Sequence, residues 1–190
     1  MIFFSFPVLE TERFRLRELT KEDAPHLYGY FSDEEVVQYY GLEPFTRKEQ
    51  AEQFVTQIKS GFRNGMMIRW AIVNKETGEF LGTVGYHNWN RQHRRAEIGY
   101  ELKKEVWRKG IMTEVLKTAI PFGFDRLLLN RIGATVRAEN ISSRQLLRKF
   151  RFSEEGILQE YQCYLGEFYD LLMYGLTRST YEEKTGQKQC

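Results

Sequence analysis

The spacing of apolar residues in the first third of the chain predicts one strand followed by two helices. Over residues 11–19, apolar positions alternate with arginines, which is the period of a strand with one face in solvent. Thr20 with Asp23, and Thr46 with Glu49, form capping patterns that precede apolar residues at helical spacing. We therefore expect helices to begin just after Thr20 and just after Thr46.

In the middle of the chain the period changes to two. Residues 67–73 and 80–86 alternate on either side of a turn at Thr77-Gly78, which predicts a hairpin. A third strand over 96–102 contains an interior glycine, Gly99, and such glycines often mark a bulge or a close backbone approach.

The last part alternates helices with strands. A helix begins near Gly110, and Pro121 is expected to kink or shorten it because proline removes a backbone hydrogen bond. The further elements are a strand at 130–137, a helix at 141–149 and strands around 156–161 and 168–176. We interpret residues 1–9 as an ordered arm or first strand, and expect the polar tail 179–190 to be frayed.

Strands followed by crossing helices imply some parallel pairing, whereas the hairpin implies antiparallel pairing. We therefore predict an α/β (α+β) fold with a mixed, strongly twisted central sheet of about seven strands flanked by helices. Residues 1–178 are expected to form one domain, since no repeat or linker interrupts the chain.

Composition narrows the function. The 190 residues carry 28 basic and 26 acidic side chains, so no broad positive field supports nucleic-acid binding. No apolar run approaches the roughly 20 residues of a membrane helix, and no secretory leader opens the chain. Two cysteines provide neither a disulfide framework nor metal-ligand spacing. A cytoplasmic protein without a metal, a nucleic-acid partner or a membrane partner is expected.

A basic turn is the first candidate for chemistry. Arg108, Lys109 and Gly110 lie between a strand and a helix, where unpaired backbone N–H groups and the helix dipole favour a phosphate. The plainer alternative is a chain turn with solvated basic side chains. From this segment alone the two interpretations are balanced.

A second candidate follows the next strand. Asn140 is a good helix cap and Ser143 an ordinary first-turn hydroxyl, and structure alone would explain both. The order of features changes the balance: a strand with a central glycine, a basic helix start, another strand, then N-x-x-S at the head of a helix.

This combination resembles the GNAT superfamily of acyl-CoA-dependent N-acetyltransferases, and within it the RimJ/RimL-like branch of ribosomal-protein N-terminal acetyltransferases. The resemblance covers nearly the whole chain. Its five segments are LETERFRLR (9–17), AEIGY (96–100), WRKG (107–110), ENISS (139–143) and GEFYD (166–170).

Four positions depart from the family pattern. Arg108 stands where a second glycine is common, Met112 where a small residue is usual, and Arg151 where a glycine usually precedes Phe152. The long Met112 side chain must turn away for the helix-start amides to reach a diphosphate. Leu147 occupies the place of the tyrosine that many members use to protonate the leaving thiolate.

The resemblance implies an acetyl-CoA-dependent enzyme that acetylates a primary amine directly. A splayed, bulged strand at 98–102 would pair with the pantetheine arm, and its backbone N–H would stabilise the charge on the thioester oxygen. The residues implied in binding acetyl-CoA are Ile98, Tyr100, Leu102, Arg108, Lys109, Gly110, Met112, Thr113 and Asn140.

Three residues are candidates for catalysis. Glu97 is the candidate base, acting through water, although a salt bridge to Arg94 or Arg95 would also explain it. By resemblance to the branch, Ser143 would donate a proton to the CoA sulfur, and Asn140 would orient the pantetheine amide or a water.

The other polar and aromatic residues are weaker candidates for a functional role. His26, His87 and His93 lack a ligand cluster, so a surface or core role is expected for each. An acceptor pocket would draw on Tyr39, Tyr40, Phe45, Trp89, Tyr161 and Tyr169, shaped by the region 33–65.

Two rival interpretations are a non-catalytic acyl-CoA-binding sensor or scaffold module, and a structural α/β domain without a cofactor. The amine acceptor stays open between a protein N-terminus and a small amine. A homodimer through the late strands, common in the family, is equally open.

Overall fold

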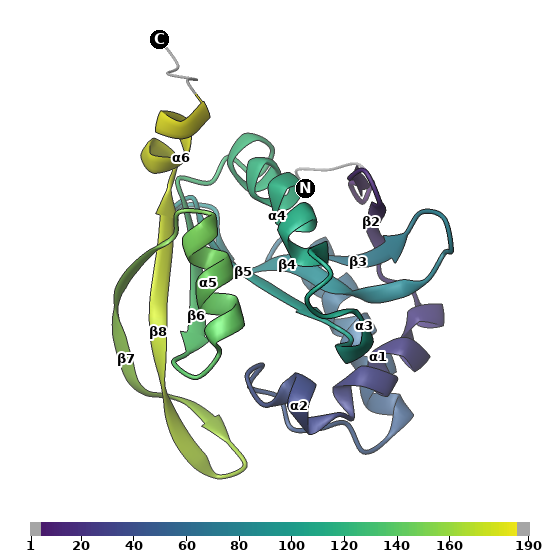
Figure 1. Cartoon of the computed structure of the whole chain (residues 1–190). Coiled ribbons are helices and arrows are strands. Elements are labelled where there is room, and N and C mark those ends of the chain that lie inside the picture. Colours follow the sequence, from purple (N-terminus) through teal and green to yellow (C-terminus); the bar gives the residue numbers. More distant parts are fainter. Residues whose placement is uncertain (1–4, 186–190) are drawn as a thin grey trace.

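The structure is a computed structural model that describes residues 5–185, and it contains one eight-stranded mixed sheet flanked by helices (Figure 1). The strand order is β1-β2-β3-β4-β5-β6-β8-β7, and the β5–β6 pair is parallel while the others are antiparallel. The strands are β1 (Leu9–Glu10), β2 (Phe14–Glu18), β3 (Ile68–Asn74), β4 (Phe80–Asn90), β5 (Arg95–Leu102), β6 (Arg131–Arg137), β7 (Ser153–Tyr164) and β8 (Glu167–Thr177). The helices are η1 (Lys21–Asp23), α1 (Ala24–Phe31), α2 (Glu34–Val37), α3 (Lys48–Arg63), η2 (Lys104–Val106), α4 (Ile111–Asp125), α5 (Ile141–Lys149) and α6 (Arg178–Thr185).

The predicted fold class is confirmed, and the strand count differs by one. The eighth strand is β1, in which Leu9 and Glu10 pair with Leu16 and Arg15 of β2, at the end of the segment interpreted as an ordered arm or first strand. Periodicity cannot find a strand of two residues, because it spans a single alternation.

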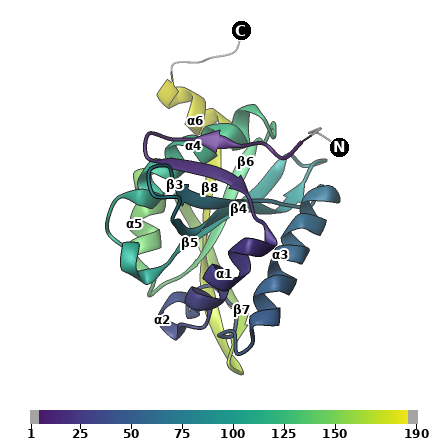
Figure 2. The ribbon, with the colours of Figure 1, turned by 90° about the vertical axis from the view of Figure 1, so that its right-hand side faces the viewer.

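The central strands of the sheet are buried on both faces, and the described residues form two hydrophobic cores. Along β3, Ile68, Trp70 and Ile72 point into the larger core, while Ala71 and Val73 point into the smaller one. Figure 1 shows α4 and α5 on one side of the sheet, and Figure 2 shows α1 and α3 on the other. The alternation of side chains along β3 therefore assigns its residues to two layers.

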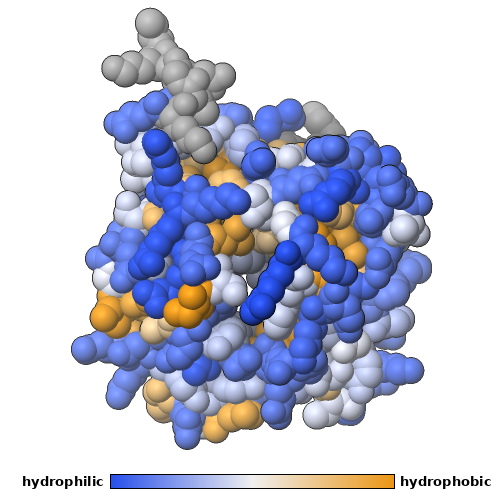
Figure 3. Space-filling model, viewed as in Figure 1, coloured by the Kyte–Doolittle hydropathy of each residue, from blue (hydrophilic) through white to orange (hydrophobic). Residues whose placement is uncertain are grey.

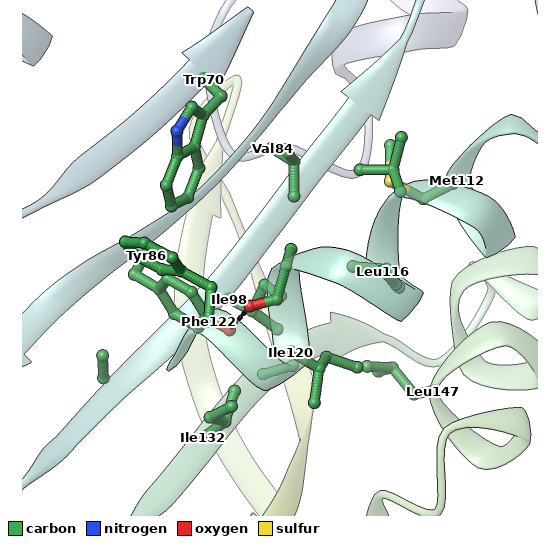
Figure 4. Close-up of a cluster of buried hydrophobic side chains, with 14 of the residues drawn as sticks. Trp70, Val84, Tyr86, Ile98, Met112, Leu116, Ile120, Phe122, Ile132 and Leu147 are labelled. Atoms are coloured by element: carbon green, nitrogen blue, oxygen red, sulfur yellow. Dashed lines mark hydrogen bonds between the residues drawn. The ribbon is translucent and has the colours of Figure 1, made fainter. Parts of the chain in front are cut away.

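The larger core fixes α4 against the sheet. The rings of Trp70 and Phe122 meet edge to face with centroids 5.2 Å apart, and the buried Tyr86 hydroxyl donates to the Ala119 carbonyl at 2.8 Å (Figure 4). The helix continues through Pro121 to Asp125, so of the expected kink or shortening, the shortening does not occur. Packing of both turns around the proline outweighs the missing hydrogen bond.

One of the two predicted helix starts is confirmed. Thr20 and Asp23 form a capping box, and the Thr20 backbone N–H donates to the Asp23 carboxylate at 2.8 Å. The Thr46–Glu49 pair is wrong by one residue: α3 is capped at Arg47, and the Gln50 amide oxygen accepts from the Thr46 and Arg47 backbone N–H groups.

Residues 178–185 are more ordered than the polarity of the predicted tail suggests. Instead of fraying from residue 179, the chain forms α6, whose Tyr181 ring stacks on Phe124 with centroids 4.5 Å apart. The Arg178 guanidinium donates to the backbone carbonyls of Phe124 and Leu129. The last residues of the predicted tail, 186–190, and the first of the predicted arm, 1–4, lie outside the described residues.

The sheet opens between β5 and β6. These strands pair over Arg95–Arg131, Ala96–Ile132 and Glu97–Gly133, after which β5 continues along β4 and β6 continues along β8. The predicted splay is thus present. The predicted bulge in β5 is not, because its register with β4 runs unbroken from Glu97 to Leu102; the irregularity lies in β4, between His87 and Asn90.

Candidate active site

A cavity of about 330 Å³ occupies the opening between β5 and β6. Figure 3 shows the surface hollowed near its centre, ringed mainly by hydrophilic side chains. Because the strands part there, the cavity is lined by residues from both layers of the molecule. The lining residues are Tyr39, Tyr40, Phe54, Gln57, Ile58, Met67, Arg69, Tyr86, His87, Ile98, Gly99, Tyr100, Ala134, Thr135, Val136, Asn140, Ser143 and Gln162.

Two hydroxyl groups meet on the α5 side of this cavity. The Tyr100 and Ser143 hydroxyl oxygens are 2.9 Å apart and hydrogen-bonded. Asn140 caps α5, because its side-chain oxygen accepts from the Ser143 backbone N–H at 3.1 Å. Burial raises the pKa of Tyr100 to about 12, although the Ser143 hydrogen bond opposes the rise. Both hydroxyls are therefore protonated at neutral pH and available as donors.

Tyr100 provides a phenol that the family pattern places elsewhere. Leu147, at the position of the usual tyrosine, is fully buried in the larger core. Sequence reasoning assigned Tyr100 to the cofactor strand and missed its hydroxyl. The signal was present, because the period of two puts Tyr100 on the same face as Ile98, toward α5.

Glu97 does not line the cavity, whereas its neighbour His87 does. The Glu97 carboxylate accepts from the Asn88 side chain at 3.0 Å and lies 3.7 Å from His87 Nε2. In the described part of the chain, this contact replaces the ion pair expected with Arg94 or Arg95. His87, expected to be an ordinary core or surface residue, is instead part of the cavity wall.

A buried ion pair lies beside His87. Arg69 donates to the Glu101 carboxylate at 2.5 Å and to the Thr83 hydroxyl at 2.6 Å. The Tyr30 hydroxyl donates to the same carboxylate at 3.1 Å. Both charged side chains are only 6% exposed, so each neutralises the other out of water.

The His87 ring of β4 packs over Gly99 of β5. A Cβ at Gly99 would lie 3.2 Å from the His87 ring and 3.7 Å from Arg69 Nη1. A side chain at this position would crowd the His87 ring, so Gly99 leaves room for that ring in a strand without a bulge.

The basic turn before α4 fits an anionic group. Arg108 and Gly110 have left-handed backbone angles, with φ of 60° and 73°, and Arg108, Lys109 and Gly110 are exposed. The Met112 side chain is buried in the larger core and turned away from the turn (Figure 4). The helix-start amides thus lie in an exposed turn that a phosphate group can approach.

The remaining predicted cofactor-binding residues differ in burial and in the hydrogen-bonding groups that are free to contact acetyl-CoA. Ile98 is buried with its side chain on the cavity wall, and Thr113 is half-buried in the first turn of α4. The Leu102 carbonyl already accepts from the Trp107 indole N–H at 2.8 Å. Its oxygen is therefore less available to a pantetheine arm than the resemblance implies.

The structure brings two of the six aromatic candidates to the cavity, Tyr39 and Tyr40. Phe45 and Trp89 are buried in the cores, and Tyr161 is exposed. The Tyr169 ring lies under the Arg137 guanidinium at 3.5 Å.

Neither a metal centre nor a membrane helix is found within residues 5–185. That part of the chain holds no group of three or more His, Cys, Asp or Glu side chains arranged to bind a metal ion. It also has no helix long and apolar enough to cross a bilayer.

Comparison with known proteins assigns the chain to a class. The family described as acetyltransferase (GNAT) domain matches residues 13–153. The chain therefore belongs to the GNAT family and is an acetyl-CoA-dependent acetyltransferase, with similarity to the RimJ/RimL-like branch.

Particular relatives show how far the similarity extends. An uncharacterized N-acetyltransferase of Bacillus subtilis, YoaA, is 41% identical over 91% of this chain and 98% of its own length. Spermidine N(1)-acetyltransferase of Escherichia coli K12 is 30% identical over 76% of this chain and 75% of its own length. The structure of RimL, a ribosomal L7/L12 alpha-N-protein acetyltransferase, in complex with coenzyme A matches with a TM-score of 0.80 and 20% identity, covering 92% of this chain and 99% of that one.

Proposed function

We propose that the enzyme transfers an acetyl group from acetyl-CoA directly to a primary amine. The observation that carries the proposal is the cavity at the splay, which is continuous from the α5 layer to the α3 layer of the sheet. Donor and acceptor can enter from opposite layers and meet between β5 and β6. Such an arrangement serves direct transfer because it holds the two reacting groups together.

The residues of the α5 layer have separate roles in this proposal. Amides around Lys109 and Gly110, with the Arg108 and Lys109 charges, hold the diphosphate. The backbone of 98–101 faces the pantetheine arm. Asn140 fixes Ser143 through its cap, and the paired Ser143 and Tyr100 hydroxyls donate a proton to the leaving sulfur.

The α3 layer holds the acceptor. Its amine must lose a proton before it attacks, and Glu97 is the carboxylate candidate, set behind the cavity wall. We infer an acceptor that is a protein N-terminus or a small amine, and an enzyme that works in the cytoplasm as a single domain. A homodimer through β7 and β8 is a further proposal, which size measurement in solution would test.

The decisive test combines binding with turnover. Acetyl-CoA should stabilise the protein against heat, since a ligand present at about 100 times its Kd adds about 2.7 kcal/mol. Thiol release with a panel of peptides and small amines, followed by mass spectrometry of the products, should reveal an acetylated amine. Binding without thiol release would favour the non-catalytic module, and absence of binding would favour a structural domain.

A further inference from the structure

We propose that His87 is the group that takes the proton from the amine, and that Glu97 is a positioning residue behind it. This inference rests on the proposed function and replaces the water expected between Glu97 and the amine with a named side chain. His87 is one of only three histidines in the sequence and the one that lines the cavity.

The register of the sheet places this pair. His87 of β4 lies directly opposite Glu97 of β5, so both side chains lie on one face, within the reach of cross-strand partners. His87 Nε2 is 3.7 Å from the Glu97 carboxylate, and Glu97 is also held by the Asn88 side chain at 3.0 Å. The carboxylate thereby fixes the ring from behind without reaching the cavity.

The ring also has a defined position over β5. Its Cε1 and Nδ1 atoms lie 3.2 and 3.4 Å from the point where a Cβ of Gly99 would be, next to Tyr100. With Nε2 turned toward Glu97, Nδ1 is the nitrogen left to accept a proton. Gly99 and Tyr100 are consecutive residues whose side-chain positions lie on opposite faces of β5, so the base lies on the acceptor face of the strand and the Tyr100 phenol on the face of α5.

The charges around His87 suit a base. Burial lowers the pKa of His87, the Arg69 guanidinium of β3 lowers it further, and Glu97 of β5 opposes them. Arg69 is itself paired with Glu101, and Arg131 of β6 interacts electrostatically with Glu97. Because the net shift is downward from 6.5, the imidazole is neutral at pH 7 and can accept a proton.

The proton balance is simple. An ammonium acceptor gives one proton to His87, and the freed lone pair bonds to the acetyl carbon. The C–S electron pair leaves with sulfur, which is protonated through the Ser143 and Tyr100 hydroxyls, and the second amine proton replaces the one those hydroxyls give. His87 then returns its proton to solvent.

The test is the pH dependence of kcat/KM of the full chain with acetyl-CoA and an amine that it acetylates. The kcat/KM of the wild type should decrease at acid pH, where His87 becomes protonated. Between this acid limb and the pKa of the amine, kcat/KM should change little with pH. His87→Gln keeps a side chain of similar length without a base. The kcat/KM of His87→Gln should be at least tenfold lower than that of the wild type at pH 7. It should rise about tenfold per pH unit between the wild-type acid limb and the pKa of the amine, because only the free amine reacts.

Two variants separate this proposal from its alternatives. His93→Gln, in the exposed turn between β4 and β5, is the matched control and should keep the flat region. Glu97→Gln should also keep it, with the acid limb moved to lower pH because the carboxylate no longer raises the pKa of His87. A flat region that persists in His87→Gln, or that is lost in Glu97→Gln alone, would overturn the proposal. Absence of thiol release from the wild type with every amine would instead refute the proposed function.

Discussion

At the scale of single residues, Ser143 carries a prediction about the leaving group. Ser143→Ala removes one of the two paired hydroxyls and should lower kcat by about 10²-fold, the lower end for general acid catalysis, because Tyr100 is still present. Affinity for acetyl-CoA, measured by calorimetry, should change little. Ser142→Ala, an exposed hydroxyl in the same helical turn, is the control. A large loss of affinity with normal turnover would contradict the role.

Gly110 carries a prediction about the anion-binding turn. Its φ of 73° lies in the left-handed region, where a Cβ costs about 1 kcal/mol. Gly110→Ala should therefore lower the free energy of unfolding by about that amount and also weaken acetyl-CoA binding.

Gly78 is its matched control, because it has a φ of 72° and open space around it in the β3–β4 turn. Gly78→Ala should lose similar stability and keep its affinity for acetyl-CoA. Equal affinities of the two variants would show that the turn before α4 does not hold the donor.

At the scale of elements, the Arg69–Glu101 pair ties β3 to β5 beneath the cavity. Arg69→Met leaves a buried carboxylate without its cation and should cost about 3–5 kcal/mol in urea unfolding. The double variant Arg69→Met/Glu101→Leu should be clearly more stable than the single one, because no charge is left unpaired. A single variant no less stable than the double would mean that water reaches Glu101.

The elements also show how much could be predicted from the sequence. The β3–β4 hairpin, α5 and the splay after Glu97 were accessible, because each depends on local periodicity or on a motif carried by resemblance. The Gln50 cap and the docking of α6 were not. Both depend on which side chain reaches a particular backbone group, and sequence periodicity does not determine that.

The positions of the helix-start candidates could be predicted from the sequence. Asn140, Ser143 and Gly110 lie at the starts of α5 and α4, as capping and turn preferences indicate, while their functional roles were implied by the family resemblance and stay predictions. The contacts of the Tyr100 hydroxyl and of His87 were missed because they form between elements: the first from the approach of α5 to β5, the second from the register that places His87 opposite Glu97.

At the scale of the whole molecule, the lining of the cavity bears on the acceptor. Among the described residues, none of its lining side chains is an aspartate or glutamate, although one relative acetylates spermidine. A second ammonium would lose its hydration there without gaining a carboxylate. We expect butylamine to exceed 1,4-diaminobutane in kcat/KM by at least tenfold. Preference for the diamine would show that acidic groups reach the acceptor.

The short β5–β6 ladder has a mechanical consequence. Three facing residue pairs connect the half of the sheet formed by β1 to β5 with the half formed by β6, β8 and β7. Acetyl-CoA bound between β5 and β6 would contact both halves of the sheet. We therefore expect the two halves to move relative to each other more in the free protein than in the complex.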